Sequence, residues 1–171
     1  MTMACRPMTA ADIDAVAEVR IRSWQAAYRG IVPQPYLDSL SPAAEAARRR
    51  ARLPLAPGQH VAELGGRVVG WLAIGPYRDD DGDAPAPGCG EILAIYSLPD
   101  RWGQGIGRAL MGYALGDLRR QGLAPVLLWV LAANDRARRF YQRAGFRPDG
   151  ATHDFEIGGA TLPEVRYRHY G

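Results

Sequence analysis

Three glycines at alternate positions follow an apolar segment near the middle of the chain. Gly103, Gly105 and Gly107 lie between the apolar residues 92–96 and an alanine- and leucine-rich segment that is expected to form a helix. Because glycine has no Cβ and tolerates positive φ angles, a ligand can approach the backbone N–H groups of such a turn. At a helix N-terminus these donors favour an anionic group. The turn therefore predicts a binding site for a phosphate or pyrophosphate.

A second group of candidates lies on the helix expected at residues 134–144. Asn134 stands at its N-cap, and Ala137 and Tyr141 follow three and seven positions later, which places all three on one helix face. Taken alone, this spacing also fits a tyrosine ring that packs in the core. The glycine turn one strand and one helix upstream favours a functional tyrosine.

The basic residues of the chain are all arginines, because the sequence contains no lysine. A phosphate-binding P-loop requires a Gly-Lys-Ser/Thr sequence, and a pyridoxal enzyme requires a Schiff-base lysine, so both classes are excluded. The net charge of +3 suits an anionic cofactor. The arginines are scattered rather than arranged in a stripe, which argues against nucleic acid as a partner.

The cysteines and the apolar segments indicate the cellular setting. Cys5 and Cys89 make no disulfide framework, which favours a reduced, cytoplasmic environment. No apolar run approaches the ~20 residues that span a membrane, and the first residues lack the pattern of a secretory signal. We therefore expect a cytoplasmic protein with no membrane partner.

Apolar periodicity and turn residues divide the chain into strands and helices that must position these candidates. Strands are expected at residues 4–8, 60–64, 68–74, 91–97, 125–131, 151–157 and 162–170. Helices are expected at residues 11–28, from Ser41-Pro42 onward, at 105–120 and at 134–144. Pro7 and Pro163 cannot donate to a strand ladder and suggest edge strands. Gly65-Gly66 suits a tight hairpin turn.

The segment 75–90 is rich in proline, glycine and aspartate, and it is long for an internal loop. Its aspartates at 79–83 do not have the spacing of an EF-hand calcium loop, so we expect a solvated acidic loop and no metal site. The order of elements predicts a mixed α/β fold with one sheet, no repeats and no second domain.

Two blocks of sequence, in this order, resemble the GNAT superfamily of acetyl-CoA-dependent N-acetyltransferases. The first is Leu98-Pro-Asp-Arg-Trp-Gly-Gln-Gly-Ile-Gly-Arg-Ala-Leu-Met. The second is Leu128-Trp-Val-Leu-Ala-Ala-Asn-Asp-Arg-Ala-Arg-Arg-Phe-Tyr-Gln-Arg-Ala-Gly-Phe, and Arg22-Ser-Trp-Gln-Ala-Ala-Tyr-Arg-Gly-Ile-Val-Pro gives weaker support. The resemblance implies a single domain over residues 1–171, with a central, mixed, mostly antiparallel twisted sheet of about seven strands flanked by about four helices.

The same resemblance implies acetyl-CoA as the acetyl donor. Backbone groups of Ile95, Tyr96 and Ser97 are expected to bind the pantetheine arm, and Asn134 and Tyr141 are expected to lie near the cofactor. The pyrophosphate is expected at Trp102, Gly103, Gln104, Gly105, Ile106 and Gly107, with Arg108 adding charge. Many family members carry Arg or Gln where this chain has Trp102, so the loop is expected to depend on backbone donors.

Acetyl transfer also explains the residue types. A primary amine must attack the thioester unprotonated, and the departing thiolate needs a proton; a phenol with a pKa of about 10 can supply it to a thiol with a pKa of about 8.5. The resemblance assigns this general-acid role to Tyr141. Glu91 is the candidate general base, although a solvated carboxylate at a strand end fits it equally. A base acting through water, or His60, stays open.

The acceptor amine is not specified by the sequence. Trp24 and Tyr28 are candidate walls of its site, and nearby acids such as Asp154 or Glu156 would suit a cationic amine. The acceptor is expected to be a small molecule or a peptide or protein amine, and relatives suggest a homodimer. Two other functions stay open: a catalytically silent acyl-CoA-binding module, and a dinucleotide-binding unit, which fits poorly because its acidic partner residue is missing.

Overall fold

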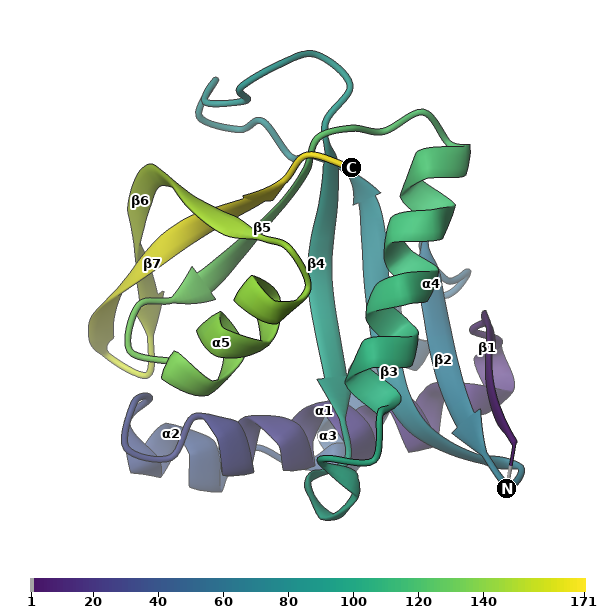
Figure 1. Ribbon diagram of the computed structural model, residues 1–171. Helices are drawn as coiled ribbons and strands as arrows, with labels where there is room; N and C mark the ends of the chain where they lie inside the picture. Colours follow the sequence, from purple (N-terminus) through teal and green to yellow (C-terminus); the bar gives the residue numbers. More distant parts are fainter. Residues whose placement is uncertain (1) are drawn as a thin grey trace.

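The computed structural model describes residues 2–171 and is built around one seven-stranded sheet with the strand order β1-β2-β3-β4-β5-β7-β6 (Figure 1). The strands are β1 (Met3–Pro7), β2 (Gln59–Leu64), β3 (Arg67–Pro76), β4 (Gly90–Ser97), β5 (Val126–Leu131), β6 (Arg147–Ile157) and β7 (Ala160–His169). Only β4 and β5 pair in parallel. The prediction of a mixed, mostly antiparallel sheet is therefore confirmed.

Helices cover both faces of the sheet. They are α1 (Ile13–Ala27), α2 (Gln34–Ser39), α3 (Pro42–Arg50), α4 (Ile106–Arg120) and α5 (Asp135–Arg143), with short 3-10 turns at Ala10–Asp12 and Pro99–Arg101. In Figure 1, α4 and α5 lie on the near face of the sheet and α1 to α3 on the far face. Among residues 2–171, no helix has the length and apolar character needed to cross a membrane.

Local capping residues explain where the first helices begin. The Thr9 N–H and hydroxyl both donate to the Asp12 carboxylate, at 2.8 and 3.0 Å, and this pair starts the turn that leads into α1. The Ser41 hydroxyl accepts the Ala44 N–H at 3.3 Å, and the following proline fixes the first turn of α3. The short helix α2 was not predicted, because six residues give too little periodicity.

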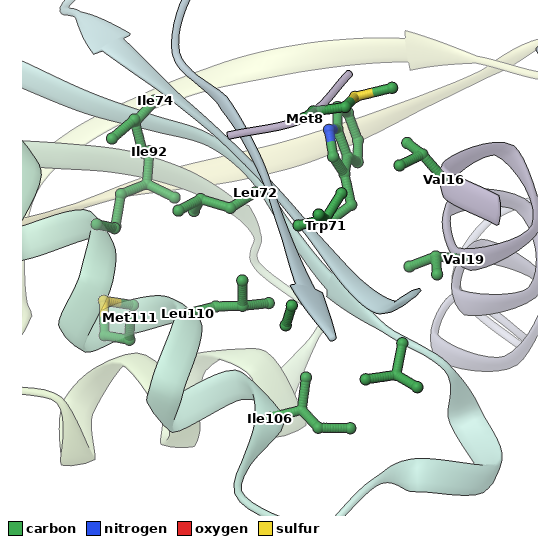
Figure 2. Packing of buried hydrophobic residues seen from close by; sticks show 14 of the residues in the cluster. Met8, Val16, Val19, Trp71, Leu72, Ile74, Ile92, Ile106, Leu110 and Met111 are labelled. Atoms are coloured by element: carbon green, nitrogen blue, oxygen red, sulfur yellow. The ribbon is translucent and has the colours of Figure 1, made fainter. Parts of the chain in front are cut away.

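Successive side chains of β3 point to opposite faces of the sheet and pack against the helices on each face. Trp71 packs with Val16 and Val19 of α1, whereas Leu72 lies on the side of Leu110 in α4 (Figure 2). Gly70 lets α4 approach the sheet closely, because a Cβ there would lie 2.9 Å from side-chain atoms of α4. The N-terminal end of α4, which carries the glycine turn, is thereby fixed against the middle of the sheet.

The last two strands correct one expectation. Pro163 suggested an edge strand, but β7 lies between β5 and β6, and β6 is the edge strand at this end of the sheet. The Pro163 carbonyl accepts the Ala132 N–H at 2.9 Å, so the proline nitrogen also faces the β5 side. Leu131 is the last β5 residue in register with β7, where it pairs with Glu164. The Pro163 nitrogen therefore lies beyond the end of β5, and the missing N–H removes no hydrogen bond between the two strands. The edge position expected from Pro7 in β1 is confirmed.

Candidate active site

The two parallel strands separate soon after they pair. Only Gly90 with Val126 and Glu91 with Leu127 are in register, after which β4 and β5 diverge (Figure 1). On its other side, β4 contains a bulge at Leu93, since Ile92 pairs with Ile74 and Ala94 with Ala73. A bulge bends its strand and increases the local twist, which helps to open this gap.

A cavity of about 1400 Å³ occupies the opening between β4 and β5. Its walls come from both faces of the sheet: α1, β4, the glycine turn, β5, α5 and the hairpin of β6 and β7. Many of the candidates predicted from the sequence line this cavity: Trp24, Tyr28, Glu91, Ile95, Tyr96, Ser97 and all of residues 102–108. Asn134 and Tyr141 line it from α5.

The glycine turn presents unpaired backbone donors at the start of α4. Gly103 and Gly105 have φ angles of 81° and 84°, a region that side chains with a Cβ rarely adopt. The Ala109 N–H bonds to the Gly105 carbonyl at 3.0 Å, whereas the N–H groups of 105–108 have no backbone acceptor within the described chain. These four free donors lie at the positive end of the helix dipole, an arrangement that favours an anionic group.

Trp102 brings a positive charge to the turn from another helix. The Arg136 guanidinium of α5 lies 3.3 Å from the centre of the Trp102 ring, and the indole Nε1 donates to the Ser97 carbonyl at 3.1 Å. Desolvation lowers the pKa of Arg136, which still leaves an arginine charged at neutral pH. Further arginines that line the cavity are Arg101, Arg108, Arg139 and Arg143. The turn is therefore cationic although Trp102 itself carries no charge.

The edge of β4 offers fewer free groups than the sequence suggested. The Leu98 N–H bonds to the Val69 carbonyl, so the backbone groups of Tyr96 also face β3, and those of Ile95 and Ser97 face the gap. The Ser97 carbonyl already accepts from the Ser23 hydroxyl at 2.7 Å as well as from Trp102. Ile95 therefore supplies the open backbone donor and acceptor, while Tyr96 contributes its ring.

Asn134 starts α5 and is buried. Its Oδ1 accepts the Ala137 N–H at 3.2 Å, which is the N-cap contact expected from the sequence. The side-chain amide nitrogen of Asn134 has no hydrogen-bond partner among residues 2–171, so it is the part of this residue available to a ligand.

Tyr141 contacts other aromatic rings, while its hydroxyl makes no hydrogen bond to residues 2–171. The ring packs edge-on against Phe140 and Phe146, with centroid distances of 5.4 and 6.1 Å. Burial raises the pKa of Tyr141 well above its ordinary value, and the nearby Tyr96 adds to the effect. The phenol therefore keeps its proton at neutral pH and can act as a donor.

Tyr28 and Tyr96 contact one another in the wall of the cavity. The hydroxyls of Tyr28 and Tyr96 lie 3.3 Å apart, and Trp24 packs edge-on against Tyr28 at 4.9 Å. Desolvation raises the pKa of Tyr28 well above its ordinary value, with smaller contributions from Tyr96, Tyr141 and Glu164. Both predicted acceptor-site residues, Trp24 and Tyr28, are therefore near the tyrosine proposed from the second sequence block.

Glu91 lies in the cavity wall, but it is neither solvated nor free. Its side chain is 2% exposed, and its carboxylate accepts three hydrogen bonds from Arg78: from Nη2 at 2.8 Å, and from Nε and the backbone N–H at 3.1 Å each. His60 is buried on β2 beside Tyr113 and does not line the cavity. Desolvation lowers the pKa of His60, which favours a neutral core histidine.

Side chains that no sequence motif indicated line the cavity from β5, β6 and β7. Trp129, His153, Phe155 and Glu164 all point to this compartment because they share one face of the sheet. A usable signal was present, since the two-residue turn Gly158-Gly159 fixes the hairpin register and sets His153 opposite Glu164. Asp154 lies on the other face and does not line the cavity.

Acidic residues gather at this compartment without forming a metal site. Asp80, Asp81 and Asp83 of the loop 77–89 line the cavity together with Glu91 and Glu164. No cluster of three or more His, Cys, Asp or Glu side chains suited to a metal ion occurs in residues 2–171. The cavity thus has an arginine-rich end at the glycine turn and carboxylates elsewhere along its wall.

Comparison with known proteins identifies the family. The model of the acetyltransferase (GNAT) family matches residues 19–146, so the chain belongs to this family. YuaI of Bacillus subtilis (strain 168), named as an uncharacterized N-acetyltransferase, is 34% identical over 156 residues, which cover 90% of this chain and 85% of YuaI. The chain is accordingly an enzyme of the N-acetyltransferase class.

Solved structures show the same fold. PaiA N-acetyltransferase of Thermoplasma acidophilum, in complex with coenzyme A, superposes with a TM-score of 0.73 at 20% identity and covers 100% of both chains. YncA of Salmonella typhimurium, solved with its cofactor acetyl-CoA, gives a TM-score of 0.70 at 23% identity, covering 99% of this chain and 94% of YncA. The GNAT fold predicted from the sequence is confirmed.

Proposed function

We propose that residues 1–171 act as one domain that transfers an acetyl group from acetyl-CoA to a primary amine by direct attack. The observation that carries this proposal is the cavity between β4 and β5, which joins the cationic glycine turn to Tyr141 and to an acidic, aromatic compartment. Its two kinds of wall match an anionic donor and an amine acceptor.

The residues present fit acetyl-CoA. The free N–H groups of 105–108 suit its diphosphate, and Arg108 and Arg136 add positive charge. The pantetheine arm contains amide groups, and Ile95 offers a backbone donor and acceptor with no strand partner on the β5 side. When bound, acetyl-CoA supplies an activated acyl carbon and a thiolate leaving group.

Tyr141 is the proposed general acid. Its hydroxyl has no partner among residues 2–171 to compete for its proton, and a phenol is protonated at neutral pH. Donation of this proton converts the departing thiolate to a thiol. The Ile95 N–H faces the gap between β4 and β5, so it can donate to negative charge that develops on the acyl oxygen.

Trp24 and Tyr28 are proposed as walls of the acceptor site. The acidic residues on the same cavity favour a cationic amine by electrostatic attraction. Peptide N-termini, antibiotics, polyamines and amino-acid analogues all present such an amine. A homodimer and a cytoplasmic location stay predictions of the sequence.

The base role of Glu91 also stays a prediction. Its ion pair with Arg78 counts against it, because a carboxylate whose two oxygens already accept hydrogen bonds has little capacity left for a substrate proton. A base that acts through a water molecule, the alternative that the sequence leaves open, does not have to contact the amine directly.

The experiment combines binding and turnover. Thermal shifts with acetyl-CoA and with coenzyme A measure binding, and thiol release measures transfer to spermidine, an aminoglycoside, free amino acids and alanine-leading peptides. Enzymatic acetyl transfer predicts a shift with acetyl-CoA and thiol release with one of these amines. A shift without thiol release for any amine supports the silent binding module, and no shift at all contradicts both.

A further inference from the structure

His153 and Glu164 form a close pair on the hairpin of β6 and β7. They are direct partners in the strand register, and the His153 Nε2 lies 2.6 Å from the Glu164 Oε2. The imidazole also stacks on the Trp129 ring, with a centroid distance of 3.8 Å and an interplanar angle of 23°. The contact with Glu164 is made by a ring nitrogen, and the contact with Trp129 is made by the ring face. Together they fix the orientation of this side chain.

The carboxylate partner determines which nitrogen of His153 is free. An ionised carboxylate only accepts hydrogen bonds, so the Nε2 of His153 carries the proton that faces Glu164. In the neutral imidazole Nδ1 then keeps its lone pair. Nδ1 makes no hydrogen bond to residues 2–171, and His153 lines the cavity. The pair thus presents an oriented, unoccupied proton acceptor.

This acceptor lies in the same compartment as the predicted amine site. Trp129, His153 and Glu164 share one sheet face with Leu131, which packs in a cluster with Trp24 and Tyr28. Glu164 acts electrostatically on Tyr28, whose hydroxyl contacts Tyr96. His153, Glu164, Tyr28, Tyr96 and Tyr141 thus all line the same cavity.

Arg166 and Asp83, two other charged groups on this side of the cavity, pair with one another, and Asp80 and Asp81 line the cavity without an ion pair to His153. Arg166, two residues after Glu164 on the same face of β7, bonds to Asp149 at 2.7 Å and to Asp83 at 3.2 Å. Tyr77 of the acidic loop donates to Asp83 at 2.8 Å. On β5 the side chain that stacks on His153 is Trp129, which carries no charge. Glu164 is thus the charged group in direct contact with His153.

Resting on the acetyl transfer proposed above, we propose that His153 is the general base that deprotonates the acceptor ammonium, with Glu164 as its positioning residue. One ammonium proton passes to Nδ1 of His153, and the resulting imidazolium is stabilised by the Glu164 carboxylate. The neutral amine nitrogen bonds to the acetyl carbon as the C–S bond breaks. Tyr141 protonates the sulfur, and the second proton lost by the nitrogen restores Tyr141. His153 then releases its proton to water.

The kinetic test compares four variants with the wild type, using the amine from the panel that the wild type acetylates fastest. His153→Gln is expected to lower kcat/KM about 10²-fold at pH 7, and the loss should shrink as the pH rises, because more of the amine is then neutral in solution. Glu164→Gln should give a smaller loss and move the acid limb of the pH profile to lower pH, because the imidazolium loses its carboxylate. Glu91→Gln should retain the acid limb.

Asp154→Asn is the matched control, because Asp154 is adjacent to His153 but lies on the opposite face of β6 and outside the cavity. It should leave both rate and pH profile unchanged. Thermal shift with coenzyme A shows that each variant is folded and binds. An unchanged acid limb in His153→Gln overturns the proposal, as does its loss in Glu91→Gln. If the wild type acetylates no amine, the proposed function fails and the base assignment fails with it.

A second readout needs no turnover. Imidazole ¹⁵N spectra of the free protein should show His153 as the Nε2–H form, with its signals assigned by their absence in His153→Gln. Glu164→Gln should change this tautomer population, since the fixed carboxylate acceptor is gone. A predominant Nδ1–H form of neutral His153 in the wild type would contradict the proposal even if acetyl transfer is observed.

Discussion

The substitution Tyr141→Phe removes one oxygen atom from the cavity and little else. The ring contacts with Phe140 and Phe146 stay, and the hydroxyl has no hydrogen-bond partner among residues 2–171 that would be left unsatisfied. Since no polar group is orphaned, the free energy of unfolding should change by less than about 0.5 kcal/mol. The same change removes the proposed proton donor.

The kinetic effect is expected to be far larger than the effect on stability. Loss of a positioned general acid lowers turnover by about 10²-fold, which corresponds to about 2.7 kcal/mol of activation free energy. KM for acetyl-CoA should change little, because we propose that the diphosphate binds the free N–H groups of residues 105–108, away from Tyr141. The assay is thiol release under saturating acetyl-CoA, with chemical denaturation measured on the same preparation.

Tyr167→Phe supplies the contrasting control. Tyr167 is fully buried, and its hydroxyl accepts from Arg138 Nε at 3.0 Å and from Gln142 at 3.3 Å. Removing that hydroxyl leaves the Arg138 donor without this partner and should cost about 1–3 kcal/mol of stability, while kcat stays near the wild-type value. The reasoning is refuted if Tyr141→Phe keeps wild-type turnover, or if it loses turnover only in proportion to a loss of folded protein.

Three further predictions concern cofactor affinity, packing and pH. Arg136→Ala should raise KM for acetyl-CoA about fivefold with little change in kcat, because it removes a positive charge beside the proposed diphosphate site, and about 1 kcal/mol of lost attraction is about fivefold in affinity; an unchanged KM in steady-state kinetics would contradict this. Leu110→Ala should lower the free energy of unfolding by about 2–5 kcal/mol in urea titrations, because this side chain is fully buried between α4 and the sheet. Hydrogen bonds from Arg6 lower the pKa of Asp12 to about 2, so this carboxylate stabilises the fold above its unfolded pKa of about 4. That contribution should disappear as the pH falls from about 4 toward 2, and acid titrations of Asp12→Asn should lack this step.

The elements around the site were predictable where the signal was local. The glycine turn, the Asn134 cap and the hairpin at Gly65-Gly66 each depend on a few consecutive residues, and the structure has all three where the sequence placed them. The edge position predicted from Pro163 was wrong because a proline removes the N–H donor from only one side of its strand. Whether that side faces a neighbour depends on where β5 ends, which is a long-range property.

The candidate site was predictable on the cofactor side and less so on the acceptor side. Residues 102–108 and Tyr141 lie within two short blocks whose spacing determines their geometry. The contacts of Glu91 and Trp102 could not be predicted in this way. Arg78 is thirteen residues from Glu91 along the chain, and Arg136, which contacts Trp102, comes from another helix. Neither contact follows from the spacing along the chain, although each changes what the predicted residue can do.

The turn that exposes backbone donors, the helix face that carries Tyr141 and the tight turn at Gly65-Gly66 could all be predicted from the order of the amino acids. These features follow from backbone conformation and from periodicities of a few residues, which are local. Tertiary structure alone decided that β4 and β5 separate after two paired positions and that side chains from three helices and four strands line the resulting cavity. The physical reason is that strand pairing and side-chain packing join residues far apart in the chain, and their free energy depends on the whole fold.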